Sequence, residues 1–534
     1  MMTFATKFTC FTGINLLCAL ALVVSGCGEA REAARHGGAV PVSSEQFYYT
    51  SPHTAVSEEN RTEFNTEAYD HIVENPFLLS KSNPLSTFSV DVDTASYANL
   101  RRFLNRNQLP PAGAVRIEEL VNYFDYHYSP PTGDDPFSVH VEVAECPWEE
   151  SHLLAKIGLK GKEIELENRP LSNLVFLLDV SGSMEDFNKL PLVKSSMKLL
   201  LEQLGENDRI AIVVYAGASG LVLPSTSADH RTEILSKLDD LEAGGSTNGG
   251  EGIELAYRIA GDNFIRGGVN RVILCTDGDF NVGRTNQSDL VNLIENKAKS
   301  GVFLSVLGFG MGNLKDSTME LLADKGNGNY SYIDSMNEAE KVLVEQMSGT
   351  LITIAKDVKI QVDFNPAQVQ SYRLIGYENR MLRNEDFLDD TKDAGEIGAG
   401  HTVTALYELV PVGIESEVAE VEPSKYQQES ELSASANTDE LLTVRLRYKD
   451  PEGLDSKPIS LTVKKQDLSL TEASTDFHFA SAVAAFGMLL RESKHCGTMT
   501  LERVNSIAEQ NLGDDPHGYR EEFLQLVKKA QLLE

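Results

Sequence analysis

The sequence predicts an α/β protein with a doubly wound, mainly parallel sheet at its centre, flanked by a small α+β leader module, a β-rich module and a C-terminal helical segment. Three observations predict this fold class. In residues 171–352, apolar strand-like runs alternate with helical patterns, as in sheets covered by helices on both faces. Residues 353–470 contain alternating strand-like runs separated by turns and an acidic linker. In residues 471–534, apolar side chains recur at helical spacing.

Length, composition and charge limit the possible functions. The chain has 534 residues, of which 41% are hydrophobic and 24% charged, which is ordinary for a globular protein with several domains. It has 47 Lys and Arg against 80 Asp and Glu, so its formal net charge is −33. Because this charge repels nucleic-acid phosphates, the sequence predicts no nucleic-acid partner.

The first 27 residues resemble the signal peptide of a bacterial lipoprotein. An apolar stretch at 14–24, too short to span a bilayer comfortably, ends in Val24-Ser25-Gly26-Cys27. The resemblance implies that the chain is exported and lipid-anchored to a membrane at Cys27; ordinary signal cleavage with an incidental cysteine is the alternative. Gly28, not Asp, follows this cysteine, which by the same resemblance favours the outer membrane over the inner membrane.

The remaining cysteines predict no disulfide framework. Two of the six lie in the signal and Cys27 is the candidate lipid site, which leaves Cys146, Cys275 and Cys496. Cys275 lies in an apolar run that is typical of core packing. The sequence leaves open whether Cys146 and Cys496 pair.

A tether and a small leader module precede the central segment. Residues 28–83 are polar and rich in small side chains, which predicts a flexible tether. The leader, residues 84–170, starts with a strand-like alternation at 87–93, followed by helical patterns. Asp91 and Asp93 share one face of that strand, and solvated edge charge is favoured there over a metal-binding or acid pair.

Polar side chains follow two predicted strands of the central segment and occur in one glycine-rich loop. These residues are Asp179, Ser181, Ser183, Thr247 and Asp277. Both aspartates follow apolar runs, and ligands of such sheets bind at the carboxyl ends of the strands. Carboxylate and hydroxyl oxygens suit Mg²⁺, with Mn²⁺ or Ca²⁺ as alternatives. The sequence therefore predicts one divalent-metal site, against the alternative that these residues only cap helices and form a turn.

This pattern resembles the metal-ion-dependent adhesion site of von Willebrand factor type A (vWA) domains, which have a Rossmann-like fold. The shared order is Asp-x-Ser-x-Ser, then Thr, then Asp. The resemblance implies that Ser181, Ser183 and Thr247 contact the metal directly or nearly so. It implies that Asp179 and Asp277 act mostly through water.

Three further stretches resemble a narrower family, the bacterial YfbK-like lipoproteins. They are STFSVDVDTASY at 86–97, TDGDFNVG at 276–283 and GFGMGN at 308–313. The resemblance covers residues 84–534 and implies a leader module, a vWA domain at 171–352 and a C-terminal domain of unknown role.

The ligand set predicts a binding function and no enzymatic activity. Few anionic protein ligands leave the metal electrophilic, with a position that an acidic side chain of a protein partner can fill. The alternatives are a metal-dependent hydrolase and a structural envelope protein whose metal only stabilises the fold. A phosphatase of the dehalogenase type needs an aspartate where this chain has Ser181, and no nucleophile elbow occurs in the sequence.

Overall fold

The computed structural model describes the residues from 67 onwards with short gaps. The described residues are 67–90, 93–164, 169–246, 249–278, 287–346, 349, 351–392, 394–414, 418, 432–451, 453–465 and 473–534. All of them belong to one unit, residues 63–534. The predicted signal peptide, Cys27 and residues 28–66 of the predicted tether lie outside the described residues.

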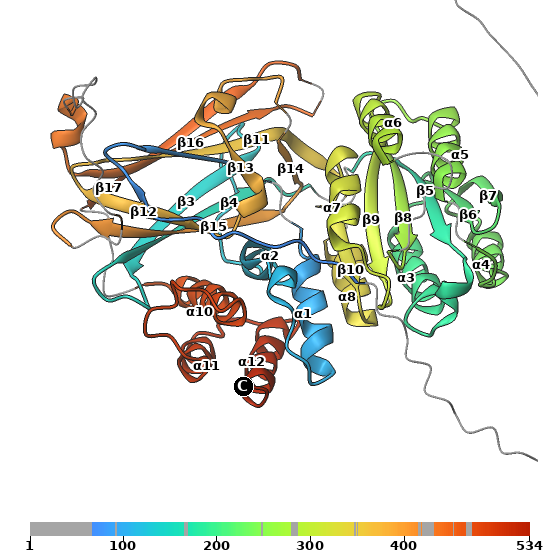
Figure 1. The fold of residues 1–534 in the computed structure, drawn as a ribbon. Coiled ribbons are helices and arrows are strands. Elements are labelled where there is room, and N and C mark those ends of the chain that lie inside the picture. The colour runs from blue at the N-terminus through green and yellow to red at the C-terminus, as the bar shows by residue number, and fades with distance from the viewer. Residues whose placement is uncertain are drawn as a thin grey trace, which may run out of the picture. The chain divides into compact units, whose positions relative to one another are not determined.

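A six-stranded sheet in the order β10-β9-β8-β5-β6-β7 forms the central part of the chain (Figure 1). Neighbouring strands are parallel, except that β7 runs antiparallel to β6 at one edge. The strands are β5 (Ser172–Asp179), β6 (Arg209–Tyr215), β7 (Ser219–Ser227), β8 (Val269–Thr276), β9 (Phe303–Phe309) and β10 (Tyr330–Ile333).

Helices cover both faces of this sheet (Figure 1). They are α3 (Leu190–Gln203), α4 (Arg231–Asp239), α5 (Gly249–Asp262), α6 (Gln287–Lys299), α7 (Asp316–Lys325), α8 (Met336–Glu340) and the π-helix η4 (Lys341–Glu345). Successive side chains of a strand point to opposite faces. Accordingly, Leu174 and Phe176 belong to a core with α3, α4 and α8, whereas Val175 belongs to a second core with α5, α6 and α7. These two cores confirm the predicted doubly wound sheet.

Two antiparallel sheets, ordered β1-β12-β15-β4-β3 and β13-β2-β11-β16-β17 with β14 paired to β11, share a third core. The strands before the central sheet are β1 (Leu78–Leu79), β2 (Leu85–Ser89), β3 (Phe137–Glu145) and β4 (Leu153–Gly161). Those after it are β11 (Thr353–Phe364), β12 (Val369–Ile375), β13 (Met381–Leu382), β14 (Gly395–Gly398), β15 (Thr402–Pro411), β16 (Glu440–Lys449) and β17 (Lys457–Lys464). Apolar side chains from both sheets fill the space between them, as in a β-sandwich.

A fourth core joins helices from both ends of the described chain. It holds side chains of α1 (Ala95–Asn105), α2 (Ile117–Asn122), α10 (Thr475–Leu490), α11 (Leu501–Gln510) and α12 (Tyr519–Gln531). Figure 1 shows α1 in blue beside α12 in red, and Arg101 of α1 forms an ion pair with Glu522 of α12. Short 3-10 helices complete the described elements: η1 (Ala112–Ala114), η3 (Gly182–Glu185), η5 (Glu378–Arg380), η6 (Asn384–Phe387) and η7 (Ala434–Asn437).

The leader does not form a module of its own, in contrast to the expectation for residues 84–170. Strand β2 pairs with β11, and β4 pairs with β15. The leader strands therefore belong to sheets that also contain strands from after the central sheet. The leader helices complete the C-terminal helical core in the same way.

The last part of the expected tether is also structured. Strand β1 pairs with β12, and Phe77 is buried. Glu67 forms a bidentate pair with Arg102 of α1, with oxygen–nitrogen distances of 2.7 and 2.9 Å. The pairing of β1 with β12 and the ion pair of Glu67 with Arg102 thus hold residues 67–83 in place. The local sequence pattern reveals neither contact, because each partner lies outside this segment.

The described residues contain neither a membrane-crossing helix nor a disulfide. No helix among them has the length and apolar character that crossing a bilayer requires. The three described cysteines, Cys146, Cys275 and Cys496, are all free. Burial raises the pKa of the Cys496 thiol to about 11.

Candidate metal-binding site

The carboxylate of Asp179 ends β5 and is oriented by two neighbouring strands. The residue is 1% exposed. Its Oδ1 accepts a hydrogen bond from the backbone N–H of Ser181 (2.9 Å). Its Oδ2 accepts from the hydroxyls of Tyr215 at the end of β6 (3.1 Å) and Thr276 at the end of β8 (3.3 Å). The carboxylate is therefore fixed at the carboxyl edge of the sheet.

The loop after β5 brings two hydroxyls together at this edge. The Oγ atoms of Ser181 and Ser183 lie 3.0 Å apart, on either side of Gly182. The backbone N–H of Gly182 donates to the carbonyl of Gly245 (3.1 Å), and the N–H of Gly244 donates to the carbonyl of Val180 (2.7 Å). These bonds hold the glycine-rich loop against the first loop. Thr247, the predicted ligand in the glycine-rich loop, lies outside the described residues.

Asp277 follows β8 and contacts a lysine that no sequence pattern marks as part of the site. The carboxylate is fully buried, and its Oδ2 lies 2.9 Å from Lys189 Nζ. The same amine donates to the backbone carbonyl of Ser183 (2.9 Å). Gly310, at φ +70°, leaves room for the lysine, because a Cβ there would lie 2.4 Å from the lysine's aliphatic carbons. Asp277 lies 88 residues after Lys189, so the local sequence pattern gives no signal of this contact.

The two carboxylates influence each other electrostatically. Burial, together with the nearby charge of Asp277, raises the pKa of Asp179 to about 6, although hydrogen bonds from Ser181 lower it. Two buried like charges favour the approach of a cation. Carboxylates and hydroxyls at one edge form an oxygen donor set, which suits a hard divalent ion such as Mg²⁺. Within the described ranges, no group of three or more His, Cys, Asp or Glu forms a metal cluster, so the fit depends on the hydroxyls.

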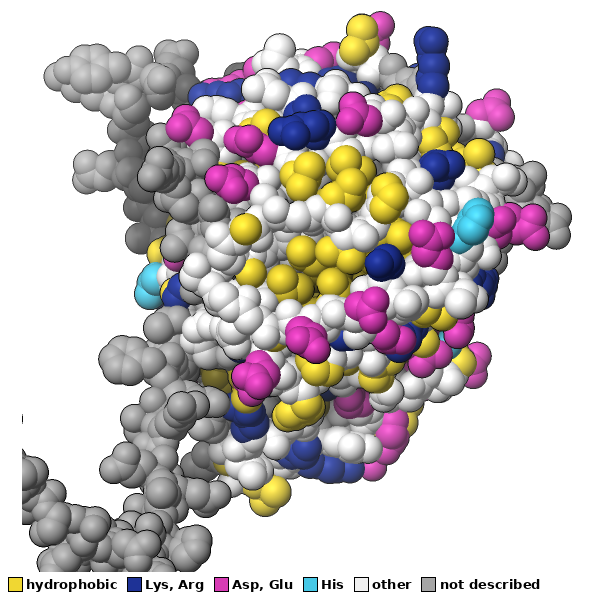
Figure 2. Space-filling view, turned by 90° about the vertical axis from the view of Figure 1, so that its right-hand side faces the viewer, with side chains coloured by type: hydrophobic (Ala, Val, Ile, Leu, Met, Phe, Trp, Pro, Cys, Tyr) yellow, Lys and Arg dark blue, Asp and Glu magenta, His cyan; other side chains and the backbone are white. Residues whose placement is uncertain are grey.

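The surface beside this edge includes an exposed aromatic side chain. Phe187, in the loop between η3 and α3, is 85% exposed. Figure 2 shows the side of the molecule that carries β6, β7, α4 and α5, where hydrophobic side chains gather near the centre and charged ones lie around them. On the edge strand β7, Leu221 is 43% exposed. This side of the central sheet therefore offers apolar surface as well as polar groups.

Asp93 is buried, so the expectation of a solvated edge charge is wrong for it. It is 3% exposed, its Oδ1 accepts from the backbone N–H of Tyr330 (2.7 Å), and its Oδ2 lies 3.5 Å from Arg380 Nη2. Strand β2 ends at Ser89 and does not reach Asp93. Asp93 therefore does not lie on a strand edge, as the expectation of a solvated charge requires. Asp91 lies outside the described residues.

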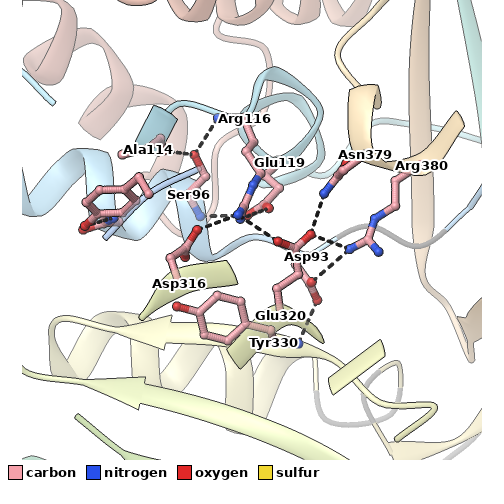
Figure 3. Close-up of polar contacts among 12 residues, drawn as sticks. Asp93, Ser96, Ala114, Arg116, Glu119, Asp316, Glu320, Tyr330, Asn379 and Arg380 are labelled. Carbon is pink, nitrogen blue, oxygen red and sulfur yellow. Dashed lines mark hydrogen bonds and ion pairs between the residues drawn. The ribbon is translucent and has the colours of Figure 1, made fainter. Parts of the chain in front are cut away.

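Figure 3 shows the ionic cluster that surrounds Asp93. Arg116, at the start of α2, pairs with Glu119 (2.9 Å), Asp316 (2.6 Å) and Glu320 (2.8 Å). Arg380 of η5 also pairs with Glu320 (2.9 Å). The cluster joins the leader, helix α7 of the central sheet and the β-sandwich. We find no sequence signal for it, because its members are up to hundreds of residues apart.

Family models match three parts of the chain. A model described as von Willebrand factor matches residues 63–156, one described as von Willebrand factor type A domain matches 173–346, and one described as Uncharacterized protein YfbK, C-terminal, matches 349–533. The second of these ranges coincides with the six-stranded sheet and its helices.

Individual proteins are similar to the chain over different lengths. The chain is 45% identical over 472 residues to "Uncharacterized protein YfbK" of Escherichia coli (strain K12), covering 87% of this chain and 81% of that protein. It is 28% identical over 203 residues to "Uncharacterized protein sll0103" of Synechocystis, covering 38% and 47% of the two chains. The solved structure of a von Willebrand factor type A protein from Catenulispora acidiphila matches with a TM-score of 0.40 and 16% identity, covering 76% of this chain and 91% of that one. Because the chain is 45% identical to the Escherichia coli protein over 87% of its own length and 81% of that protein, it belongs to the YfbK family. It contains a von Willebrand factor type A domain.

Proposed function

We propose that the protein binds a protein partner through a divalent metal ion at the carboxyl edge of its vWA sheet. The observation that carries the proposal is the meeting of two buried carboxylates, Asp179 and Asp277, with the paired hydroxyls of Ser181 and Ser183. Thr247 would supply a further hydroxyl. A bound Mg²⁺, Mn²⁺ or Ca²⁺ would offer an electrophilic position to an acidic side chain of the partner.

The residues around the site have separate roles in this proposal. The hydrogen bonds from Tyr215 and Thr276 fix the orientation of the Asp179 carboxylate, so metal binding would require little rearrangement. Phe187 would contact apolar surface next to the partner's carboxylate, since it is exposed in the adjoining loop. We propose binding and no catalysis, because Ser181 stands where a dehalogenase-type phosphatase needs a carboxylate.

Replacement of Asp179 by alanine is expected to abolish metal binding and partner capture. The substitution removes a buried carboxylate at the centre of the site and leaves the donors on Tyr215 and Thr276 without their acceptor. Metal binding is measured by titrating purified protein with Mn²⁺ and following free Mn²⁺ by electron paramagnetic resonance. Partner capture is measured by crosslinking in the native envelope with and without chelator.

Asp262→Ala is the matched control, because Asp262 is an exposed aspartate at the far end of α5. It should bind Mn²⁺ and crosslink as the wild type does. Chelator-insensitive crosslinks that persist in Asp179→Ala would contradict the proposal.

We further propose that the chain is exported and anchored by lipid at Cys27, with the outer membrane favoured over the inner membrane. The support is the apolar stretch followed by Val24-Ser25-Gly26-Cys27, with glycine next. Cys27→Ser is expected to lose incorporation of an alkyne-tagged fatty acid and to be released from the membrane fraction. Cys146→Ser, which changes a buried free thiol, is the control and should keep the label. Undiminished labelling of Cys27→Ser would refute the anchor.

A further inference from the structure

We propose that Lys189 is a resident cation of the candidate metal site, which weakens its affinity for divalent ions and stabilises its carboxylates when no metal is bound. The inference rests on the proposed function, since it concerns the same site. It assigns to this lysine the role of setting how strongly the site holds its metal.

The position of Lys189 is built into the fold. The side chain is only 5% exposed, although a lysine is rarely buried unless its amine is paired. Its Nζ bonds both the carboxylate of Asp277 and the backbone carbonyl of Ser183, each at 2.9 Å. It therefore connects the loop after β8 with the loop after β5. Gly310 keeps the channel for its aliphatic chain open.

The charges at this edge show what the lysine changes. Asp179 and Asp277 are both buried, and Lys189 offsets one of their two negative charges. A divalent ion among these groups would be repelled by the ammonium and would compete with it for the Oδ2 atom of Asp277. Without the ammonium, the buried negative charge of the two carboxylates would be offset less until a metal bound, so stability would depend more on the metal.

The test compares two neutral variants, Lys189→Gln and Lys189→Met, with the wild type. We expect both to bind Mn²⁺ about tenfold more tightly or better in the titration described above, because an opposing charge is removed. In chelator, their thermal unfolding midpoints should fall below that of the wild type. Saturating Mg²⁺ should restore the midpoints, so that the metal-induced shift exceeds that of the wild type.

Two control variants keep the test specific. Lys189→Arg retains a positive charge and should bind Mn²⁺ much as the wild type does. Lys194→Gln changes a lysine of the neighbouring helix α3, whose amine bonds the backbone carbonyls of Asp239 (3.0 Å) and Leu241 (2.5 Å) and no carboxylate of the site. It should leave both the Mn²⁺ affinity and the metal-induced shift unchanged.

The outcomes distinguish failure of the inference about Lys189 from failure of the proposed metal-dependent function. Equal or weaker Mn²⁺ affinity in both neutral variants, with metal binding by the wild type intact, would overturn the inference alone. Binding by the neutral variants but not by the wild type would support the inference and remove the metal-dependent function of the natural chain. Absence of binding in all of them would overturn both. Failure of both neutral variants to fold even with Mn²⁺ present would overturn the inference, which predicts that the metal restores the fold.

Discussion

Replacing Arg116 with methionine is expected to destabilise the fold by about 3–5 kcal/mol, because it removes the shared partner of a buried ionic cluster. Glu119, Asp316 and Glu320 are 2%, 3% and 6% exposed and all pair with this guanidinium. Burial already raises the pKa of each of the three carboxyl groups. Without the arginine, several of these charges would remain buried without adequate compensation.

Urea unfolding followed by tryptophan fluorescence measures this effect. Trp148 is the single tryptophan of the chain, and it is buried in the helical core that includes α2. The control is Arg445→Met, in which the lost pair with Asp363 is 43% and 32% exposed at its two side chains. Such a surface pair contributes little, so its unfolding midpoint should stay close to that of the wild type. Equal midpoints for Arg116→Met and Arg445→Met would show that the cluster does not stabilise the fold.

Replacing Glu118 with glutamine is expected to stabilise the protein at pH 8 by about 2–3 kcal/mol and to leave its stability at pH 4 unchanged. Glu118 is 4% exposed, and its Oε2 has no hydrogen-bond partner among the described residues. Gly376 packs against this oxygen, since a Cβ there would lie 2.7 Å away. Burial, with the neighbouring charge of Glu378, raises the pKa of Glu118 from 4.5 to about 7.

The raised pKa of Glu118 determines the direction in which stability changes with pH. Between pH 4.5 and 7 the folded protein keeps a proton on Glu118 that the unfolded chain releases. The group's contribution to stability is therefore complete below pH 4.5 and is lost as the pH rises through 7. Glutamine stays neutral, so the two proteins should differ only at higher pH.

Urea midpoints of wild type and Glu118→Gln at pH 4, 6 and 8 measure the difference. Glu509→Gln, an exposed change on α11, should track the wild type at every pH. A Glu118→Gln protein that is less stable than wild type at pH 8 would show that the carboxylate is needed in its charged form.

The central sheet and most of its candidate site could be predicted from sequence, because the signals are local. Apolar runs such as 174–178 end in polar loops, and the positions of Asp179 and Asp277 at strand ends follow from that pattern. What could not be predicted depends on distant partners. Lys189 reaches a carboxylate 88 residues later, and Asp93 is buried against Tyr330, 237 residues away. The spacing of apolar residues along the sequence indicates helices and strands, but not contacts between residues that lie so far apart.

The vWA domain separates the leader strands from their later partners in the sequence. This separation affects the order in which the chain folds. Strand β4 pairs with β3 inside the leader, but its other partner, β15, begins only at Thr402. Strand β2 ends at Ser89, and its partner β11 begins at Thr353. A chain that emerges N-terminus first would supply these two partner strands only after the whole vWA domain. The vWA domain, complete by then, can fold before they emerge. Assembly of the β-sandwich would thus be the late and slow step, with unpaired strand edges exposed until it occurs.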